Sequence, residues 1–231
     1  MSTVVEELKG QVRAAGNEFD TVMQFHEVWR PAAFDADLRA RMLPSFAGHA
    51  YHLIRIALRR EVYLGLMRLW GSRKDELRLE EIGRQLRTPK VFDALVADRI
   101  KTWPFGDEDG LRRSLQVHVD KAFEIIDRYS KGGAGEPTLA YLRKLRHEHL
   151  AHRAKNPVQP EAPDQIDADV EALYGDMATL VSELFHAVLA TAYNPRDTAD
   201  GFKYYAELFW EAARGERTEG HPRYRPPPTS P

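Results

Sequence analysis

The sequence contains no cysteine. This absence excludes disulfide-stabilised scaffolds, cysteine-based zinc fingers, iron–sulfur sites and thiol nucleophiles. Long apolar runs are also missing, since an uncharged stretch such as residues 184–195 is about half of the roughly 20 residues that a membrane span needs. Residues 1–16 carry charges where a signal peptide has an apolar core. We therefore expect a cytoplasmic protein that has no membrane partner.

The chain has 231 residues, of which 43% are hydrophobic and 29% are charged, as is typical of a globular domain. The formal net charge of −2 conceals a local asymmetry. Basic residues dominate residues 143–155, whereas residues 161–195 contain acidic residues and no lysine or arginine. The basic stretch favours an anionic partner, although the acidic stretch could instead neutralise it within the fold.

Apolar residues recur at helical spacing in two clear series, from Tyr51 to Leu69 and from Val170 to Val188. No alternating pattern is long enough to predict a sheet. We therefore predict an all-α fold. The predicted helices cover residues 3–29, 45–70, 78–87, 89–103, 108–130, 138–154, 164–192 and 195–214.

Residues that cap or break helices support these boundaries. Thr88 and Asn194 each precede a proline, a pattern that favours a capped helix start. Glycines at 132–135 and prolines within 157–163 mark two breaks. The proline-rich residues 215–231 cannot continue a helix. The sequence thus predicts one domain over residues 1–214 and a flexible tail over 215–231.

Residues 139–153 hold the strongest candidate site. A helical wheel places Leu139, Leu142 and Leu150 on one stripe, and Arg146 lies in the middle of that stripe. Burying an unpaired guanidinium group is very costly. Arg146 must therefore either form a structural ion pair with a carboxylate or face a site.

Histidines follow Arg146 along the same flank of the predicted helix. His149 and His152 continue its rotation, and roughly 9 Å of helix rise separates Arg146 from His152. An arginine and a histidine suit phosphoryl chemistry, and a two-fold pairing of this helix would close the site. A zinc site at His149 and His152 is an alternative. The stretch is not the metalloprotease motif H-E-x-x-H, because Ala151 stands where the second histidine belongs.

These residues resemble a known family. Arg146, the polar His147 and then His152 resemble the R-(x four to six)-H motif of the HEPN domain, named for higher eukaryotes and prokaryotes nucleotide-binding. The wider string 142–153 and the helices around 58–69 and 77–86 are similar to the abortive-infection, AbiU-type toxin branch. The resemblance implies a HEPN-like helical bundle with additional flanking helices and a proline-rich C-terminal tail.

The resemblance also implies an activity: a metal-independent ribonuclease site that needs no cofactor, usually at a homodimer interface. Arg146 would then stabilise the phosphate, His152 would act as acid or base, and His147 would assist. The residue after the arginine is commonly Asn in this family and is His147 here. Ala154 stands where one sub-branch has a modifiable tyrosine, so the resemblance does not extend to control through that residue.

The expected function is an endoribonuclease toxin of a toxin–antitoxin or abortive-infection (phage defence) system. Its expected partners are RNA, a second copy of the chain and an antitoxin protein. Two alternatives stay open: a non-catalytic HEPN-like module that binds RNA or nucleotide, and a helical protein-interaction domain. The residues expected to bind RNA around the catalytic ones are Arg143, Lys144, His149, Arg153 and Lys155.

Overall fold

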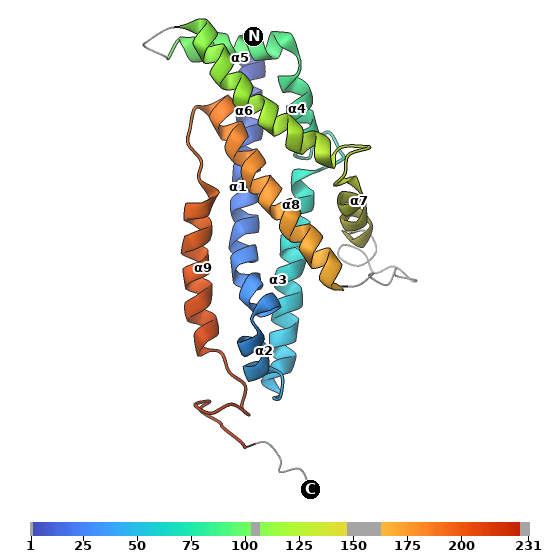
Figure 1. Cartoon of the computed structure of the whole chain (residues 1–231), viewed down its shortest axis with the longest axis vertical. Coiled ribbons are helices and arrows are strands. Elements are labelled where there is room, and N and C mark those ends of the chain that lie inside the picture. Colours follow the sequence, from blue (N-terminus) through green and yellow to red (C-terminus); the bar gives the residue numbers. More distant parts are fainter. Residues whose placement is uncertain (1, 103–106, 147–162, 227–231) are drawn as a thin grey trace. The chain divides into compact units, whose positions relative to one another are not determined.

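A computed structural model describes residues 2–102, 107–146 and 163–226. Within these ranges the regular structure is helical, with no strand and one isolated bridge between Trp70 and Arg78, so the predicted all-α class is confirmed (Figure 1). In chain order the elements are α1 (Ser2–Phe34), α2 (Ala36–Met42), α3 (Ala47–Leu69), α4 (Leu79–Leu86), α5 (Pro89–Ile100), α6 (Glu108–Tyr129), α7 (Glu136–Leu145), α8 (Pro163–Leu184), the π-helical η2 (Phe185–Leu189) and α9 (Pro195–Ala212).

Two features near residue 30 differ from the predicted helices. Helix α1 continues through Pro31 to Phe34 instead of ending at residue 29. The short helix α2, which the sequence analysis does not predict, follows at once. The Asp35 carboxylate caps α2 by accepting hydrogen bonds from the backbone N–H groups of Asp37 and Leu38, at 2.8 and 3.0 Å. An aspartate at this position satisfies donors that the first turn leaves unpaired.

The start of α5 shows a different departure. The helix begins at Pro89, as predicted, and Thr88 occupies the N-cap position. The Thr88 side chain makes no capping hydrogen bond, and its hydroxyl donates instead to the carbonyl oxygen of Arg84 in the preceding helix. The proline alone therefore supplies the local start signal, because its fixed φ suits the first helical position.

The chain divides into two compact units. The first unit combines Met1–Asp20 with Tyr63–Pro195, and the second combines Thr21–Val62 with Arg196–Pro231. Helices α1 and α3 each contribute residues to both units. The sequence analysis predicts one domain over 1–214 and does not identify this division.

An aromatic and ionic cluster joins α6 and α8 to Trp70, just after α3, in the core of the first unit. The Trp70 Nε1–H group points at the Met177 sulfur at 3.3 Å, and the Trp70 and Tyr129 rings lie 5.9 Å apart. The Tyr129 hydroxyl donates to the Asp176 carboxylate at 2.7 Å, and Arg128 pairs with the same carboxylate. Burial and this acceptor raise the pKa of Tyr129. The cluster thus gives buried polar groups partners while closing the core.

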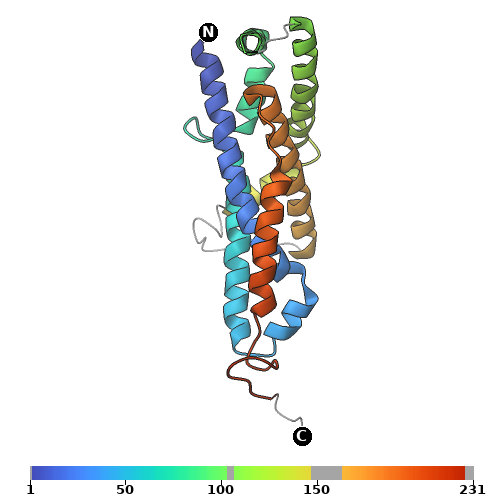
Figure 2. The same ribbon diagram turned by 90° about the vertical axis from the view of Figure 1, so that its left-hand side faces the viewer.

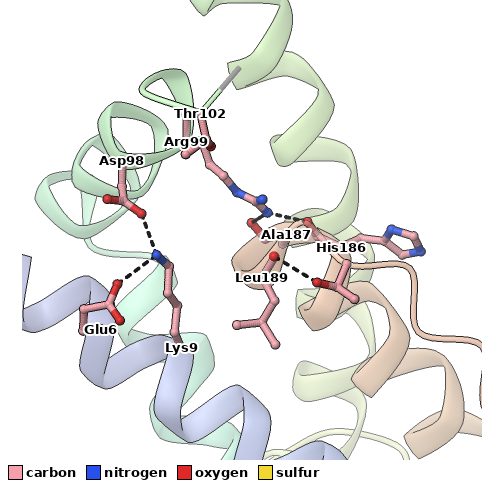
Figure 3. Close-up of polar contacts among 9 residues, drawn as sticks. Glu6, Lys9, Asp98, Arg99, Thr102, His186, Ala187 and Leu189 are labelled. Atoms are coloured by element: carbon pink, nitrogen blue, oxygen red, sulfur yellow. Dashed lines mark hydrogen bonds and ion pairs between the residues drawn. The ribbon is translucent and has the colours of Figure 1, made fainter. Parts of the chain in front are cut away.

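The π-helical segment η2, which follows α8, is tied to the rest of the first unit by a side chain (Figure 3). Arg99 of α5 donates to the carbonyl oxygens of His186 and Ala187, at 2.9 and 3.2 Å. These carbonyls lie in the final turn of the helix, where acceptors lack intrahelical partners.

An ion-pair bridge in the same unit joins α1 to α5. Lys9 of α1 pairs with Asp98 of α5 and with Glu6 of its own helix, and these hydrogen bonds raise the pKa of Lys9.

The second unit has its own core, to which both α3 and α9 contribute side chains; Figure 2 shows the two helices from the side on which α9 lies. Tyr51 and Trp210 meet edge to face at 6.0 Å. The Tyr51 hydroxyl donates to the Ala32 carbonyl oxygen at 2.6 Å, and the Trp210 indole N–H donates to the Val28 carbonyl oxygen at 2.9 Å. Both large rings are therefore buried with their polar atoms paired.

The predicted flexible tail begins with anchored residues. The Gly215 N–H donates to the Arg41 carbonyl oxygen at 3.0 Å, and the Thr218 hydroxyl donates to the same oxygen at 2.8 Å. The Glu216 carboxylate accepts from the N–H groups of Phe46 and Ala47, at 2.6 and 3.3 Å. Residue 216 thus caps the start of α3 from a distant part of the sequence.

Candidate functional site

Part of the sequence-predicted site lies among the described residues. Arg143 and Lys144 lie in the last turn of α7, and Arg146 follows as its C-terminal capping residue. The Lys144 side chain is exposed, and Arg143 and Arg146 are half-buried. The remaining predicted site residues lie outside the described ranges, so their roles stay predictions: His147, His149, His152, Arg153 and Lys155.

Helix α7 positions Arg146 through a short buried stripe. The helix has proline in its first turn, and Leu139 and Leu142 are fully buried. Arg146 comes four residues after Leu142, one helical turn further along the same stripe. The helix terminus is also a favourable place for a cation, because the last carbonyl groups carry partial negative charge. The buried stripe predicted from the sequence is therefore confirmed at Leu139 and Leu142.

Arg146 lines a cavity of about 350 Å³ in the first unit. The other walls come from α1, from the end of α3 and from the turn that follows α3. Their residues are Ala14, Glu18, Arg68, Gly71, Glu76 and Leu77. The cavity thus brings two arginines and two glutamates to one place from segments far apart in the sequence.

Both glutamates of this cavity are already bound to other groups. Glu18 accepts from the Arg68 guanidinium at 2.7 Å. Glu76 accepts from the backbone N–H groups of Arg73 and Ser72, at 3.0 and 2.8 Å, and these bonds lower the pKa of the Glu76 carboxyl. Within the described residues, no carboxylate forms an ion pair with Arg146. Of the two alternatives drawn from the sequence, this arrangement favours an arginine that faces a site.

The arrangement has the chemistry of an anion-binding site. A half-buried guanidinium group at a cavity presents several N–H donors in a planar fork, which matches the oxygens of a phosphate. Arg68 adds a second guanidinium group that is held by Glu18. The sequence analysis does not identify Arg68, Glu18 or Glu76, because only the packing of α1 against the end of α3 brings them next to Arg146.

A second cavity of the first unit, of about 480 Å³, contains two histidines. The rings of His118 and His186 stack at 4.9 Å, and His118 Nδ1 lies 2.5 Å from a carboxylate oxygen of Glu183. In the part of the chain that the structure describes, no group of three or more histidine, cysteine, aspartate or glutamate side chains could hold a metal ion. Over the same residues, no helix is both long and apolar enough to cross a membrane.

A comparison with protein families identifies the family of this chain. The family model HEPN_AbiU2, described as AbiU2, matches residues 5–209. The match covers both compact units and most of the sequence. The chain therefore belongs to the AbiU2 family of HEPN domains, which is related to abortive infection. No curated protein and no solved structure matches the chain significantly.

Proposed function

We propose that this protein is a metal-independent endoribonuclease toxin of an abortive-infection or toxin–antitoxin system, acting in the cytoplasm. One observation carries the proposal: Arg146, the arginine of the family motif, faces a cavity and pairs with no carboxylate among the described residues. Membership of the AbiU2 family supports the same reading, since HEPN domains are typically ribonucleases.

The proposed reaction takes its nucleophile from the substrate. A histidine, assigned to His152, removes the proton from the ribose 2′-hydroxyl, and the 2′-oxygen attacks the adjacent phosphorus. Arg146 stabilises the negative charge that builds on the phosphorane, with the polar His147 assisting. The P–O5′ bond then breaks and the 5′-oxygen takes up a proton. The products are a 2′,3′-cyclic phosphate and a 5′-hydroxyl.

The basic residues near the motif supply the attraction to RNA in this proposal. Lys144 is exposed and Arg143 is half-buried on α7. With His149, Arg153 and Lys155 they would bind backbone phosphates, a contribution that needs no sequence recognition and weakens as salt rises. A homodimer and an antitoxin protein are the proposed protein partners.

The test compares RNA cleavage by the purified protein and by Arg146→Ala and His152→Ala variants, all in excess EDTA. Each variant should lose roughly two or more orders of magnitude in rate, the usual scale for removing an acid–base or charge-stabilising group. Arg112→Ala is the matched control, because Arg112 lies in the same unit and its guanidinium group is bound to Asp93 at 2.7 Å. This control should cleave at the wild-type rate.

Changes to the nucleic-acid substrate and to the metal content distinguish the candidate functions. A single 2′-deoxy substitution at the cut position should block cleavage, and DNA should not be cut. Cleavage that EDTA abolishes and zinc restores would support the metal site at His149 and His152 instead. RNA binding without cleavage would support the non-catalytic module, and the absence of both would support the protein-interaction domain.

A further inference from the structure

The cavity of about 480 Å³ in the first unit contains a positive charge that has no carboxylate partner. The half-buried Arg99 side chain reaches from α5 to η2 and donates to the carbonyl oxygens of His186 and Ala187 (Figure 3). Arg99 forms no ion pair with another described residue, and its buried Nε–H group has no hydrogen-bond partner among them. Burial lowers the pKa of the Arg99 guanidinium, because its charged form is poorly solvated there. An anion in the cavity would compensate this charge.

The carboxylates of this region do not compensate Arg99, because each one already has a basic partner. Asp98 is the neighbour of Arg99 in the sequence, and Asp107 lines the cavity. Glu183 contacts His118, which lines the cavity as well. The ion pairs of these three carboxylates are Asp98 with Lys9 at 2.6 Å, Asp107 with Arg113 at 3.7 Å, and Glu183 with Lys121 at 3.3 Å. The positive charge of Arg99 therefore remains in excess.

Uncharged polar groups add to the wall of the same cavity. They are the Ser114 hydroxyl on α6 and the His186 ring on η2. Neither group forms a hydrogen bond with another described residue, and the His186 ring is held by stacking on His118 at 4.9 Å. A guanidinium group, a hydroxyl and an imidazole together suit a phosphate monoester, which presents three strong acceptor oxygens and a charge of about −1.5 to −2 at pH 7.

The size of the cavity and its remaining walls indicate an organic group beside the phosphate. Leu111 and Leu115 lie one turn apart on α6, are buried, and line the cavity together with Ala190. Pockets that bind small organic ligands have volumes of roughly 300–1,000 Å³ and mostly apolar walls with a few polar groups. The volume of about 480 Å³ lies within this range.

We propose that this cavity binds a phosphate monoester of a small organic molecule. The phosphate is held by Arg99, Ser114 and His186. The organic group packs against Leu111 and Leu115. The cavity shares no lining residue with the Arg146 cavity, and the proposal does not rest on the proposed ribonuclease activity.

Isothermal titration calorimetry with phenyl phosphate tests the proposal. The protein carries Arg146→Ala throughout, so that phosphate binding at the other cavity does not contribute. Phenyl phosphate should bind at least about tenfold more tightly than inorganic phosphate, because its ring buries apolar surface against the leucines. Phenol, which has the ring and no phosphate, should show no binding.

Two further substitutions locate the binding in this cavity. Ser114→Asp places a carboxylate at an exposed position of the wall and should weaken phenyl phosphate binding at least about tenfold by repulsion. Gln116→Glu is the matched control, because it adds the same charge to the opposite side of α6, and it should change the affinity less than about twofold. Arg99→Gln should also weaken binding at least about tenfold, because the guanidinium group is removed.

Circular dichroism and thermal melting check that each variant folds. If Arg99→Gln unfolds because η2 loses its tie to α5, Ser114→Asp decides the test, since Ser114 is exposed. Phenyl phosphate that binds no more tightly than phenol or inorganic phosphate, or binding that Ser114→Asp leaves unchanged, overturns the proposal. A 5′-phosphorylated DNA hexanucleotide that binds more tightly than phenyl phosphate, and loses this advantage with its 5′-phosphate, would assign the phosphate to a strand end and overturn the small-molecule ligand.

Discussion

Gly16 lies where α1 packs against the π-helical segment of the first unit. A Cβ atom at this position would lie 2.4 and 2.6 Å from two ring carbons of Phe185. The ring has little freedom to retreat, since it also packs against Tyr193 at 4.5 Å, and the Tyr193 hydroxyl donates to Asp20 at 2.6 Å. The glycine therefore permits a close approach that alanine would obstruct.

Gly16→Ala changes two opposing contributions to the free energy of unfolding. Alanine stabilises a helix interior by about 1 kcal/mol relative to glycine. Overpacking a close contact costs about 1–3 kcal/mol. The net result should lie between no change and a loss of about 2 kcal/mol.

A matched glycine on the same helix separates the two contributions. Gly10 also lies inside α1, but it is exposed, and a Cβ atom there would meet nothing within 4 Å. Gly10→Ala should therefore raise the free energy of unfolding by about 1 kcal/mol. Since the helix contribution is shared, the difference between the two variants measures the overpacking alone, about 1–3 kcal/mol.

The assay is urea unfolding followed by circular dichroism, with the slope compared between variants. Phe185→Leu in the Gly16→Ala background should relieve the clash, so that the two changes together cost less than the sum of the separate effects. If Gly16→Ala is as stabilising as Gly10→Ala, the close packing of α1 on Phe185 is refuted.

Three further predictions concern a carboxylate, a buried hydroxyl and the catalytic pair. Backbone N–H groups hold the pKa of Glu216 at about 2, below its ordinary 4.5, so its stabilising contribution is fully present above pH 4.5 and is lost as pH falls through about 2. Glu216→Gln should therefore melt below wild type at pH 7, and the difference in melting temperature should shrink steadily as pH falls from 4.5 toward 2. Tyr129→Phe should cost about 1–2 kcal/mol in urea unfolding, because the hydrogen bond to Asp176 is lost, and an unchanged midpoint would contradict that bond. If sites are shared between subunits, mixing Arg146→Ala with His152→Ala protein should restore RNA cleavage, whereas an active monomer would rule out sharing.

Local pattern was enough to predict most of the helices. The apolar series beginning at Tyr51 and at Val170 fall largely on buried faces of α3 and α8, because helical periodicity reports burial directly. The helix predicted over residues 3–29 ends before α1 does, since α1 continues through Pro31 to Phe34. Helix α2 was missed because its signal is a single aspartate, Asp35, before a very short segment.

The candidate site was predictable only where it interrupts a local pattern. Arg146 breaks the stripe of Leu139 and Leu142, so the sequence alone indicates that it pairs or faces a site. Glu18 and Arg68 interrupt no apolar stripe in the sequence. They lie on exposed or half-buried positions of separate helices, and only tertiary packing makes them neighbours of Arg146.

The π-helical segment after α8 has a consequence for the chain's tolerance of length changes. A π-helical turn holds one residue more than the α-helical turn it replaces. Deleting a single residue from Phe185–Leu189 would therefore return this turn to α-helical geometry, and the later side chains would keep their direction, because the π-helical turn absorbs the additional residue. Tyr193 would still face Asp20. The segment thus lets the chain carry one additional residue without changing the register in which it leaves α8.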